Sequence, residues 1–168
     1  DGMADRTVTI GGLGKTYAVT GWRIGWVVAD RALSGAIRKV HDYLTVCAPA
    51  LFQAAGVAAL GLSETYYTAM VEQYVRRRSI LLDALDAVGM PYRTPEGAYY
   101  VMADFAHVPW PCETYARPGW SPDRAFAEYL AREVGVAVVP GSSFYAGAGQ
   151  GTSRVRLNFA KREATLHE

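Results

Sequence analysis

The sequence predicts an α/β protein whose pattern changes to α+β beyond a long central helix. Three observations carry this prediction. Two β-type segments lie near the start, helical periodicity dominates the middle, and three further β-type segments surround one capped helix in the second half. These β-type segments are Thr7–Ile10, Trp22–Ala29, Ala98–Ala103, Val136–Val139 and Arg154–Ala160.

The stretch from Thr7 to Asp30 carries the clearest chemical signal. Alternating β-formers end at Ile10, and the glycines that follow are expected to break the strand into a tight loop ending at Lys15. A second apolar run, opened by Arg23, is expected to be another strand, and both strands are expected to be buried. A lysine in a glycine loop with an arginine nearby suits a phosphorylated aldehyde, since the amine forms a Schiff base and the guanidinium holds a phosphate.

Three helices are predicted next. The first, Ala32–Leu44, has apolar residues at helical spacing, and the second, Ala50–Leu60, follows Pro49 and carries almost no charge. The third runs from Glu64 to Val88, with Ser63 as N-cap and Gly89 as terminator. Its arginine run, 76–78, is expected to form a solvated face, and its apolar stripe is expected to comprise Tyr67, Val71, Tyr74, Leu81, Leu85 and Val88.

Beyond this helix the segment 106–120 is expected to be a loop. Ser121 followed by Pro122 is a strong helix start, and the helix is predicted to run to Val134 and to end at Gly135. Its inward side chains are expected to be Ala125, Phe126, Tyr129, Leu130 and Val134. Val136–Val139 is predicted to be a short buried strand.

The last predicted strand alternates cleanly between apolar and polar residues. Val155, Leu157 and Phe159 are expected on one face, and Arg154, Arg156 and Asn158 on the other. A guanidinium fork at Arg156 matches the geometry of a carboxylate, but alternation alone favours a solvent-facing arginine on an edge strand.

Composition excludes several function classes. The formal net charge of the 168 residues is +1, which argues against a nucleic-acid partner or an anionic membrane surface. No apolar run reaches the roughly 18 residues of a membrane span. The two cysteines lie far apart without metal-like spacing, so we expect no metal, reduced thiols and a cytoplasmic protein.

The segment from Lys15 to Trp26 resembles the lysine segment of class I/II, fold-type I pyridoxal-phosphate (PLP) aminotransferases. The Lys, Gly, Arg and Gly of the family pattern Ser-Lys-x-x-x-x-x-Gly-x-Arg-x-Gly fall on Lys15, Gly21, Arg23 and Gly25. The chain departs from that pattern where the family has hydroxyl side chains, since Gly14 and Gly12 stand there. Later motifs also resemble the family, namely Pro95-Glu96-Gly97, the turn Pro140-Gly141-Ser142-Ser143-Phe144, and Val155-Arg156-Leu157-Asn158-Phe159-Ala160.

The resemblance implies a PLP-dependent transaminase that acts on amino acids and 2-oxo acids as a homodimer. It implies that Lys15 carries the cofactor through a Schiff base and moves the substrate proton, and that Arg23 and the backbone of Gly12 and Gly14 hold the phosphate. It implies further that Arg156 binds the substrate carboxylate. Tyr99 and Gly141 are expected to line the substrate pocket.

The resemblance also implies three parts, with a fold-type I large α/β domain ending in this chain and a small α+β C-terminal domain following it. We expect the large PLP-binding domain over residues 1–63, an interdomain helix over 64–89 and the small domain over 90–168. On this interpretation the chain is the C-terminal portion of the usual enzyme, and residues 1–168 alone are expected to be inactive.

Three other functions stay open at this point. A carbon–sulfur lyase or a related PLP enzyme would share Lys15, Arg23 and Arg156. The chain could also come from the PLP-binding effector domain of a transcription regulator, which an attached N-terminal DNA-binding module would mark. The third alternative is an ATPase with a deviant phosphate loop, because Gly11-Gly12-Leu13-Gly14-Lys15-Thr16 resembles one. Thr9 stands where the first glycine of the standard loop belongs, and too few residues follow for the helix that such a loop opens.

Overall fold

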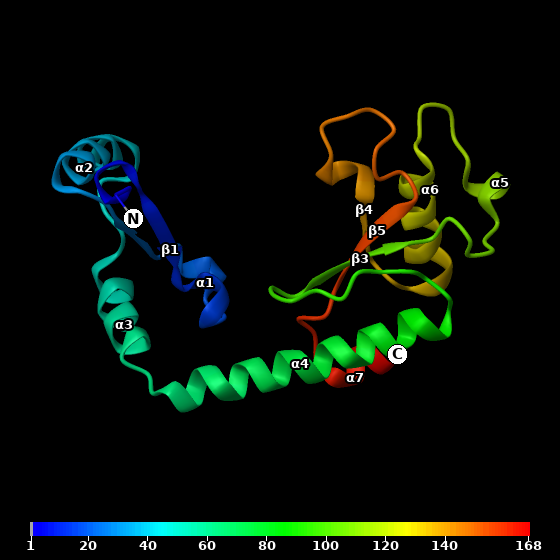
Figure 1. The fold of residues 1–168 in the computed structure, drawn as a ribbon, viewed down its shortest axis with the longest axis horizontal. Helices are drawn as coiled ribbons and strands as arrows, with labels where there is room; N and C mark the ends of the chain where they lie inside the picture. The colour runs from blue at the N-terminus through cyan, green and yellow to red at the C-terminus, as the bar shows by residue number, and fades with distance from the viewer. Residues whose placement is uncertain (1) are drawn as a thin grey trace. The chain divides into compact units, whose positions relative to one another are not determined.

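The computed structural model describes residues 2–168, and the chain forms two compact units (Figure 1). The first unit ends at Tyr66, and the second extends from Tyr67 to Glu168. No helix of the described part is long and apolar enough to cross a membrane.

The first unit contains a two-stranded antiparallel hairpin of β1 (Thr9–Gly12) and β2 (Gly25–Val28), with the short helix α1 (Leu13–Thr16) between them. The expectation that the glycines break the strand is wrong at Gly11 and Gly12, which lie within β1. The close approach of the two strands explains why glycines belong here. A Cβ atom on Gly25 would lie 2.5 Å from the carbonyl oxygen of Gly11.

The second strand is shorter than predicted, and within this chain it is not buried; the burial expected of both strands requires neighbours that the chain does not supply. Residues Thr20–Trp22 form a 3-10 turn instead of the start of a strand, and all four residues of β2 are exposed. Leu13, which is 2 % exposed, is the best buried apolar side chain of this unit. It packs against the helix α3 (Ala50–Leu60), where a Cβ atom on Gly56 would lie 2.8 Å from Leu13 Cδ1.

The helices of the first unit confirm the sequence prediction closely. Helix α2 spans Arg31–Thr45, and helix α3 spans Ala50–Leu60. Asp30 caps α2, since its carboxylate accepts a 2.8 Å hydrogen bond from the backbone N–H of Leu33.

Helix α4 spans Glu64–Ala87 and ends before Gly89, whose φ of +68° suits glycine at a helix C-terminus. The predicted apolar stripe is only partly right. Leu82 and Leu85 are the buried side chains of α4, whereas Val71 and Val88 are each 57 % exposed.

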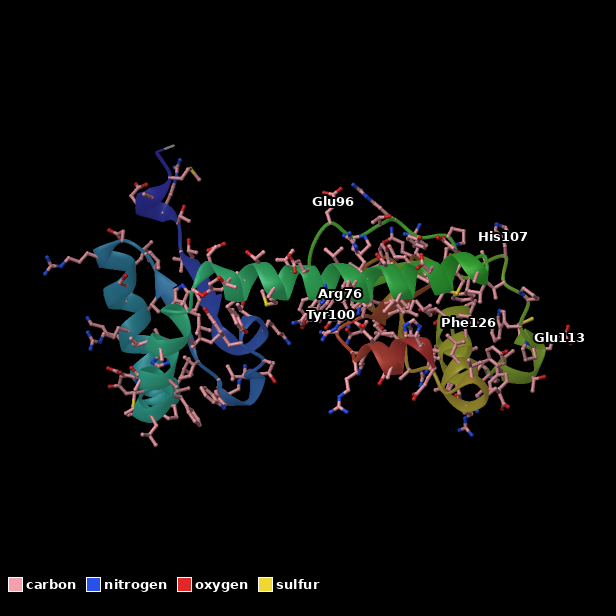
Figure 2. The ribbon with its side chains drawn as sticks, turned by 90° about the horizontal axis from the view of Figure 1, so that it is seen from below. Arg76, Glu96, Tyr100, His107, Glu113 and Phe126 are labelled. Atoms are coloured by element: carbon pink, nitrogen blue, oxygen red, sulfur yellow. The ribbon has the colours of Figure 1, made fainter. Side chains whose placement is uncertain are left out.

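The expectation of a solvated arginine face on α4 is wrong for two of the three arginines. Arg78 donates a 2.8 Å hydrogen bond to the carbonyl oxygen of Pro95, and the guanidinium of Arg77 lies 5.5 Å from the centroid of a tyrosine ring on the same helix. Arg76, labelled in Figure 2, is exposed and forms an ion pair of 3.7 Å with Glu163. All three arginines therefore contact other residues of the second unit.

A three-stranded antiparallel sheet forms the second unit, in the order β3 (Tyr100–Asp104), β5 (Arg154–Asn158) and β4 (Val139–Pro140) (Figure 1). One face of the sheet packs into the core with α4 and with α6 (Pro122–Tyr129). Phe126 of α6, labelled in Figure 2, stacks on Phe105 with ring centroids 4.1 Å apart. The core of this unit is Leu82, Leu85, Met90, Val101, Ala103, Phe105, Phe126 and Val155.

Some boundaries of the second unit differ from the prediction. Helix α6 gives way after Tyr129 to one π-helical turn over Leu130–Val134, so Val134 is 52 % exposed rather than buried. Strand β4 begins only at Val139. The predicted loop 106–120 contains the short helix α5 (Cys112–Tyr115), and the chain closes with α7 (Glu163–His167).

Candidate active site

Lys15 lies on α1, directly after the hairpin strand β1. Two hydrogen bonds to backbone carbonyl groups hold the segment that carries Lys15. The N–H of Leu13 donates to the carbonyl oxygen of Ile24 at 3.1 Å, and the Tyr66 hydroxyl donates to the carbonyl oxygen of Thr16 at 2.7 Å. Tyr66 also stacks on Tyr17 at a centroid distance of 5.7 Å, so an aromatic pair supports the turn that carries Lys15.

Arg23 adopts a backbone conformation that an arginine rarely takes. Its φ is +56° and its ψ is 43°, in the left-handed region. This conformation costs roughly 1–2 kcal/mol for a residue with a Cβ atom. Its guanidinium donates a 3.1 Å hydrogen bond to the carbonyl oxygen of Thr20 and so closes the turn on itself. Strain of this kind persists where the surrounding structure holds it and is common at functional sites.

Lys15 and Arg23 line one hollow of about 420 Å³ in the first unit. Among the described residues, its lining contains these two cations and no carboxylate, which makes it suitable for an anion. The residues that line it are Gly11, Gly12, Gly14, Lys15, Thr20, Arg23, Ile24 and Gly25. All four predicted cofactor-site residues, Gly12, Gly14, Lys15 and Arg23, are therefore brought together here, along with Thr20, which the sequence motif did not indicate.

Arg156 lies on β5, the central strand of the second unit's sheet, and not on an edge strand. Its neighbours on the strand, Val155 and Leu157, pack into the core, so Arg156 lies on the opposite face. The predicted alternation is thus confirmed. Pairing with Met102 on one side and Val139 on the other fixes its position in the sheet.

Two aromatic rings hold the guanidinium of Arg156. Its central carbon lies 4.0 Å from the ring centroid of Tyr100 and 4.5 Å from that of Phe144. Its Nε is buried and has no hydrogen-bond partner within the described part of the chain. A buried donor without an acceptor costs about 1–3 kcal/mol, so an incoming acceptor would relieve this arrangement.

Tyr99 does not take the position beside Arg156. Its ring stacks on Tyr74 of α4 at a centroid distance of 6.2 Å, and the following residue, Tyr100, contacts the arginine instead. Gly141 is buried at the start of the 3-10 turn Gly141–Phe144, which carries Phe144 to Arg156. Alternation along β3 identifies Tyr100 as the neighbour of Arg156. Tyr100 shares a face of the sheet with Met102, and Met102 is the residue that pairs with Arg156.

One carboxylate beside this turn is fully buried. Asp123 in the first turn of α6 has 0 % of its surface exposed, and its Oδ2 accepts a 2.7 Å hydrogen bond from the N–H of Ser142. Burial alone would raise the pKa of Asp123, but hydrogen bonds from Ser121 and Ser142 outweigh burial and lower that pKa below its ordinary value. Asp123 is therefore a carboxylate at neutral pH.

The predicted site residues thus fall into two groups. Lys15, Arg23 and the glycines belong to the first unit, and Arg156, Tyr99 and Gly141 to the second. No group of three or more histidine, cysteine or acidic side chains in the described residues is arranged to hold a metal ion.

Comparison with known proteins shows a match along the chain. The family model for aminotransferase class I and II matches residues 1–168. An aspartate aminotransferase of Rhizobium meliloti is 38 % identical over 169 residues, and the methionine aminotransferase of Escherichia coli (strain K12) is 34 % identical over 164. The alignments cover 99 % and 98 % of this chain but only 40 % of each relative.

Solved structures agree with these sequence matches. N-succinyldiaminopimelate aminotransferase from Mycobacterium tuberculosis superposes with a TM-score of 0.84 at 33 % identity, covering 99 % of this chain and 41 % of that one. Bna3p of Saccharomyces cerevisiae, a putative kynurenine aminotransferase by its description, gives a TM-score of 0.86 at 32 % identity, covering 98 % and 41 %. The fold is therefore that of the fold-type I aminotransferases.

Proposed function

Because the chain belongs to the class I and II aminotransferases, we propose that the full protein transfers amino groups between amino acids and 2-oxo acids with PLP attached to Lys15. The chain spans about 40 % of the length of the curated relatives it matches. Those relatives carry the names of aspartate, methionine and kynurenine transaminases. The proposal accordingly names the class of substrate and not one amino acid.

The residues of the first unit fit PLP. The hollow around Lys15 offers a primary amine for the aldehyde and the guanidinium of Arg23 for the phosphate. Glycines at 11, 12, 14 and 25 allow the backbone to come close to a bound group, because no side chain projects from them. A lining of two cations without a carboxylate among the described residues favours a phosphate over a neutral ligand.

When bound, PLP supplies an electron sink for the bond that breaks at the substrate Cα. The chain supplies the proton transfer and the binding. In this proposal the substrate amine would displace Lys15 from the cofactor, and the freed Lys15 amine would remove the Cα proton and later return a proton, acting first as base and then as acid. The left-handed backbone at Arg23 places a second cation at the end of the 3-10 turn Thr20–Trp22.

Arg156 is proposed to bind the α-carboxylate of the substrate. The rings of Tyr100 and Phe144 restrict its guanidinium, so less conformational entropy is lost when a carboxylate binds. The buried Nε without a partner is a donor that a carboxylate oxygen would satisfy. A planar guanidinium can donate two parallel hydrogen bonds, which a lysine cannot.

We also propose that the full protein is a homodimer. Supporting this, α2 and α3 of the first unit expose large apolar side chains: Tyr43 is 96 % exposed, Leu44 75 %, Leu51 83 % and Val57 73 %. An apolar area of this kind commonly marks a protein interface. Sedimentation equilibrium of the full protein and of its Leu51→Glu variant tests this: the wild type should sediment as a dimer and the variant as a monomer, while a monomeric wild type would contradict the proposal.

The presence of Lys15 and Arg23 in one glycine-lined hollow carries the functional proposal. The full protein with PLP and a panel of L-amino acids should convert 2-oxoglutarate to glutamate and release the matching 2-oxo acid. Lys15→Arg should abolish this conversion, because the amine that moves the proton is lost, whereas Lys39→Arg should retain it. Release of ammonia with thiol would indicate a lyase instead and would overturn the proposal.

A further inference from the structure

Asp123 is the one fully buried charged side chain among the described residues, and it lies outside every group discussed above as cofactor or substrate ligand. A carboxylate of this kind requires strong partners, because burying a charge is costly unless hydrogen bonds compensate. Its position in the first turn of α6 provides part of that compensation, since the helix dipole favours negative charge there.

The carboxylate connects α6 to the turn Gly141–Phe144. Asp123 Oδ2 accepts from the backbone N–H of Ser142 at 2.7 Å, which is a charge-assisted bond and stronger than a neutral one. The turn also packs closely against the start of β5 and the loop before it. A Cβ atom on Gly141 would lie 2.5 Å from the carbonyl oxygen of Gly151 and 2.6 Å from that of Arg154.

Two residues after Ser142, the ring of Phe144 lies 4.5 Å from the guanidinium carbon of Arg156. Phe144 is 43 % exposed, so the surrounding side chains do not fix its ring by burial alone. Its backbone position therefore decides where the ring lies, and that position depends on the turn. On the other side, Tyr100 is held by regular strand pairing with Asn158.

We propose that Asp123 is a positioning residue for carboxylate recognition: it holds the turn 141–144 so that Phe144 supports Arg156 in the orientation that receives the α-carboxylate of the substrate. This inference rests on the proposed function, because it assigns to Arg156 a carboxylate ligand. It adds a chain of contacts from Asp123 through Ser142 and Phe144 to the guanidinium.

Loss of the acceptor should loosen the turn without touching the chemical step. In the full protein loaded with PLP, Asp123→Ala removes the acceptor, whereas Asp123→Asn keeps a carbonyl oxygen in the same place. Asp123→Ala should raise KM for the amino acid about tenfold and change kcat less than about threefold, the pattern of lost binding that is shared by ground and transition states. Asp123→Asn should restore most of the affinity.

Binding of a carboxylic acid and of its neutral amide shows whether the effect of Asp123 depends on the charge of the ligand. Hydrocinnamate carries a carboxylate and no amine, and hydrocinnamide has the same skeleton without the charge. By calorimetry, Asp123→Ala should weaken hydrocinnamate about tenfold and leave hydrocinnamide unchanged, because only the charged group contacts Arg156. Equal losses for both probes, or no loss for either, would overturn the proposal.

Phe144→Leu tests the second link and keeps the proposal falsifiable if Asp123→Ala does not fold. It should weaken hydrocinnamate to a similar degree, and the double variant should be no weaker than either single variant, because both act through one contact. Unchanged hydrocinnamate binding by Phe144→Leu would contradict the proposal. Asp104→Asn is the matched control: it also removes a carboxylate bound by hydrogen bonds in this unit, but one that lies beside Ser153 and Arg154.

The two proposals fail in different ways. If the full protein transaminates no amino acid, the proposed function is wrong, yet the hydrocinnamate series still decides whether Asp123 positions Arg156. If transamination occurs and Asp123→Ala lowers only the melting temperature, with KM and hydrocinnamate affinity unchanged, Asp123 serves only the stability of the fold.

Discussion

The guanidinium of Arg156 on β5 lies over the ring of Tyr100 on β3, with its central carbon 4.0 Å from the ring centroid. Strand pairing produces this contact. Arg156 pairs with Met102, and Tyr100 is the diagonal neighbour on the same face of the sheet. The contact is thus fixed by register and not by a mobile loop.

Arg156→Lys should reduce amino-acid turnover and leave cofactor binding intact. A lysine supplies a point charge in place of a planar fork, so we expect a loss of about 2–4 kcal/mol in transition-state stabilisation. Steady-state kinetics together with PLP content measure the two effects. Arg154→Lys on the same strand is the control and should retain normal kinetics, because Arg154 contacts Asp104 and Tyr145 instead.

Tyr100→Leu should weaken substrate binding, whereas Tyr100→Phe should not. The ring face attracts the guanidinium by about 0.5–2 kcal/mol, and phenylalanine preserves that face. The KM values of both variants for the same amino acid measure the difference. Similar KM values for the leucine and phenylalanine variants would show that the ring does not support Arg156.

Arg23→Gly and Arg23→Ala should separate the stability of the turn from the binding of the cofactor. Both variants lose the guanidinium, so both should retain less PLP than the wild type. Only glycine adopts a φ of +56° without strain, so Arg23→Gly should melt at a higher temperature than Arg23→Ala in the cofactor-free state. Thermal melts and spectrophotometric PLP titrations give the two quantities, and normal PLP affinity in both variants would exclude Arg23 from the site.

Asp104 should make stability depend on pH in the acid range. Burial alone would raise the pKa of Asp104, but hydrogen bonds from Ala106, Ser153 and Arg154 lower it below the ordinary value of 3.8. A lowered folded-state pKa means that this stabilisation is complete above about pH 4 and is lost as the pH falls through the folded-state value. The difference in melting temperature between wild type and Asp104→Asn should therefore shrink from pH 5 to pH 2.5, and a constant difference would contradict the assignment.

The helices were predictable because local residues define their ends. Pro49 and Gly61 flank α3, whose bounds match the prediction, and Gly89 follows the end of α4 as expected. The alternation that placed Arg156 opposite the core also depends only on strand geometry. Local chemistry was sufficient in each of these cases.

The misses arise from tertiary contacts. Gly11 continues a strand because Trp26 of the partner strand comes close enough to exclude a side chain, which propensity cannot show. The left-handed backbone of Arg23 opposes the preference of its residue type. Asp123 is polar in sequence and would be assigned to the surface, yet Ser142, 19 residues later, makes its burial possible.

Identifying the lysine that carries PLP tests the role proposed for Lys15. The full protein should be incubated with PLP, reduced with borohydride, digested and mapped by mass spectrometry. This chain has three lysines, Lys15, Lys39 and Lys161, and we predict a pyridoxyl group on Lys15 alone. A pyridoxyl group on Lys39 or Lys161, or an unmodified Lys15 in protein that has bound PLP, would contradict it.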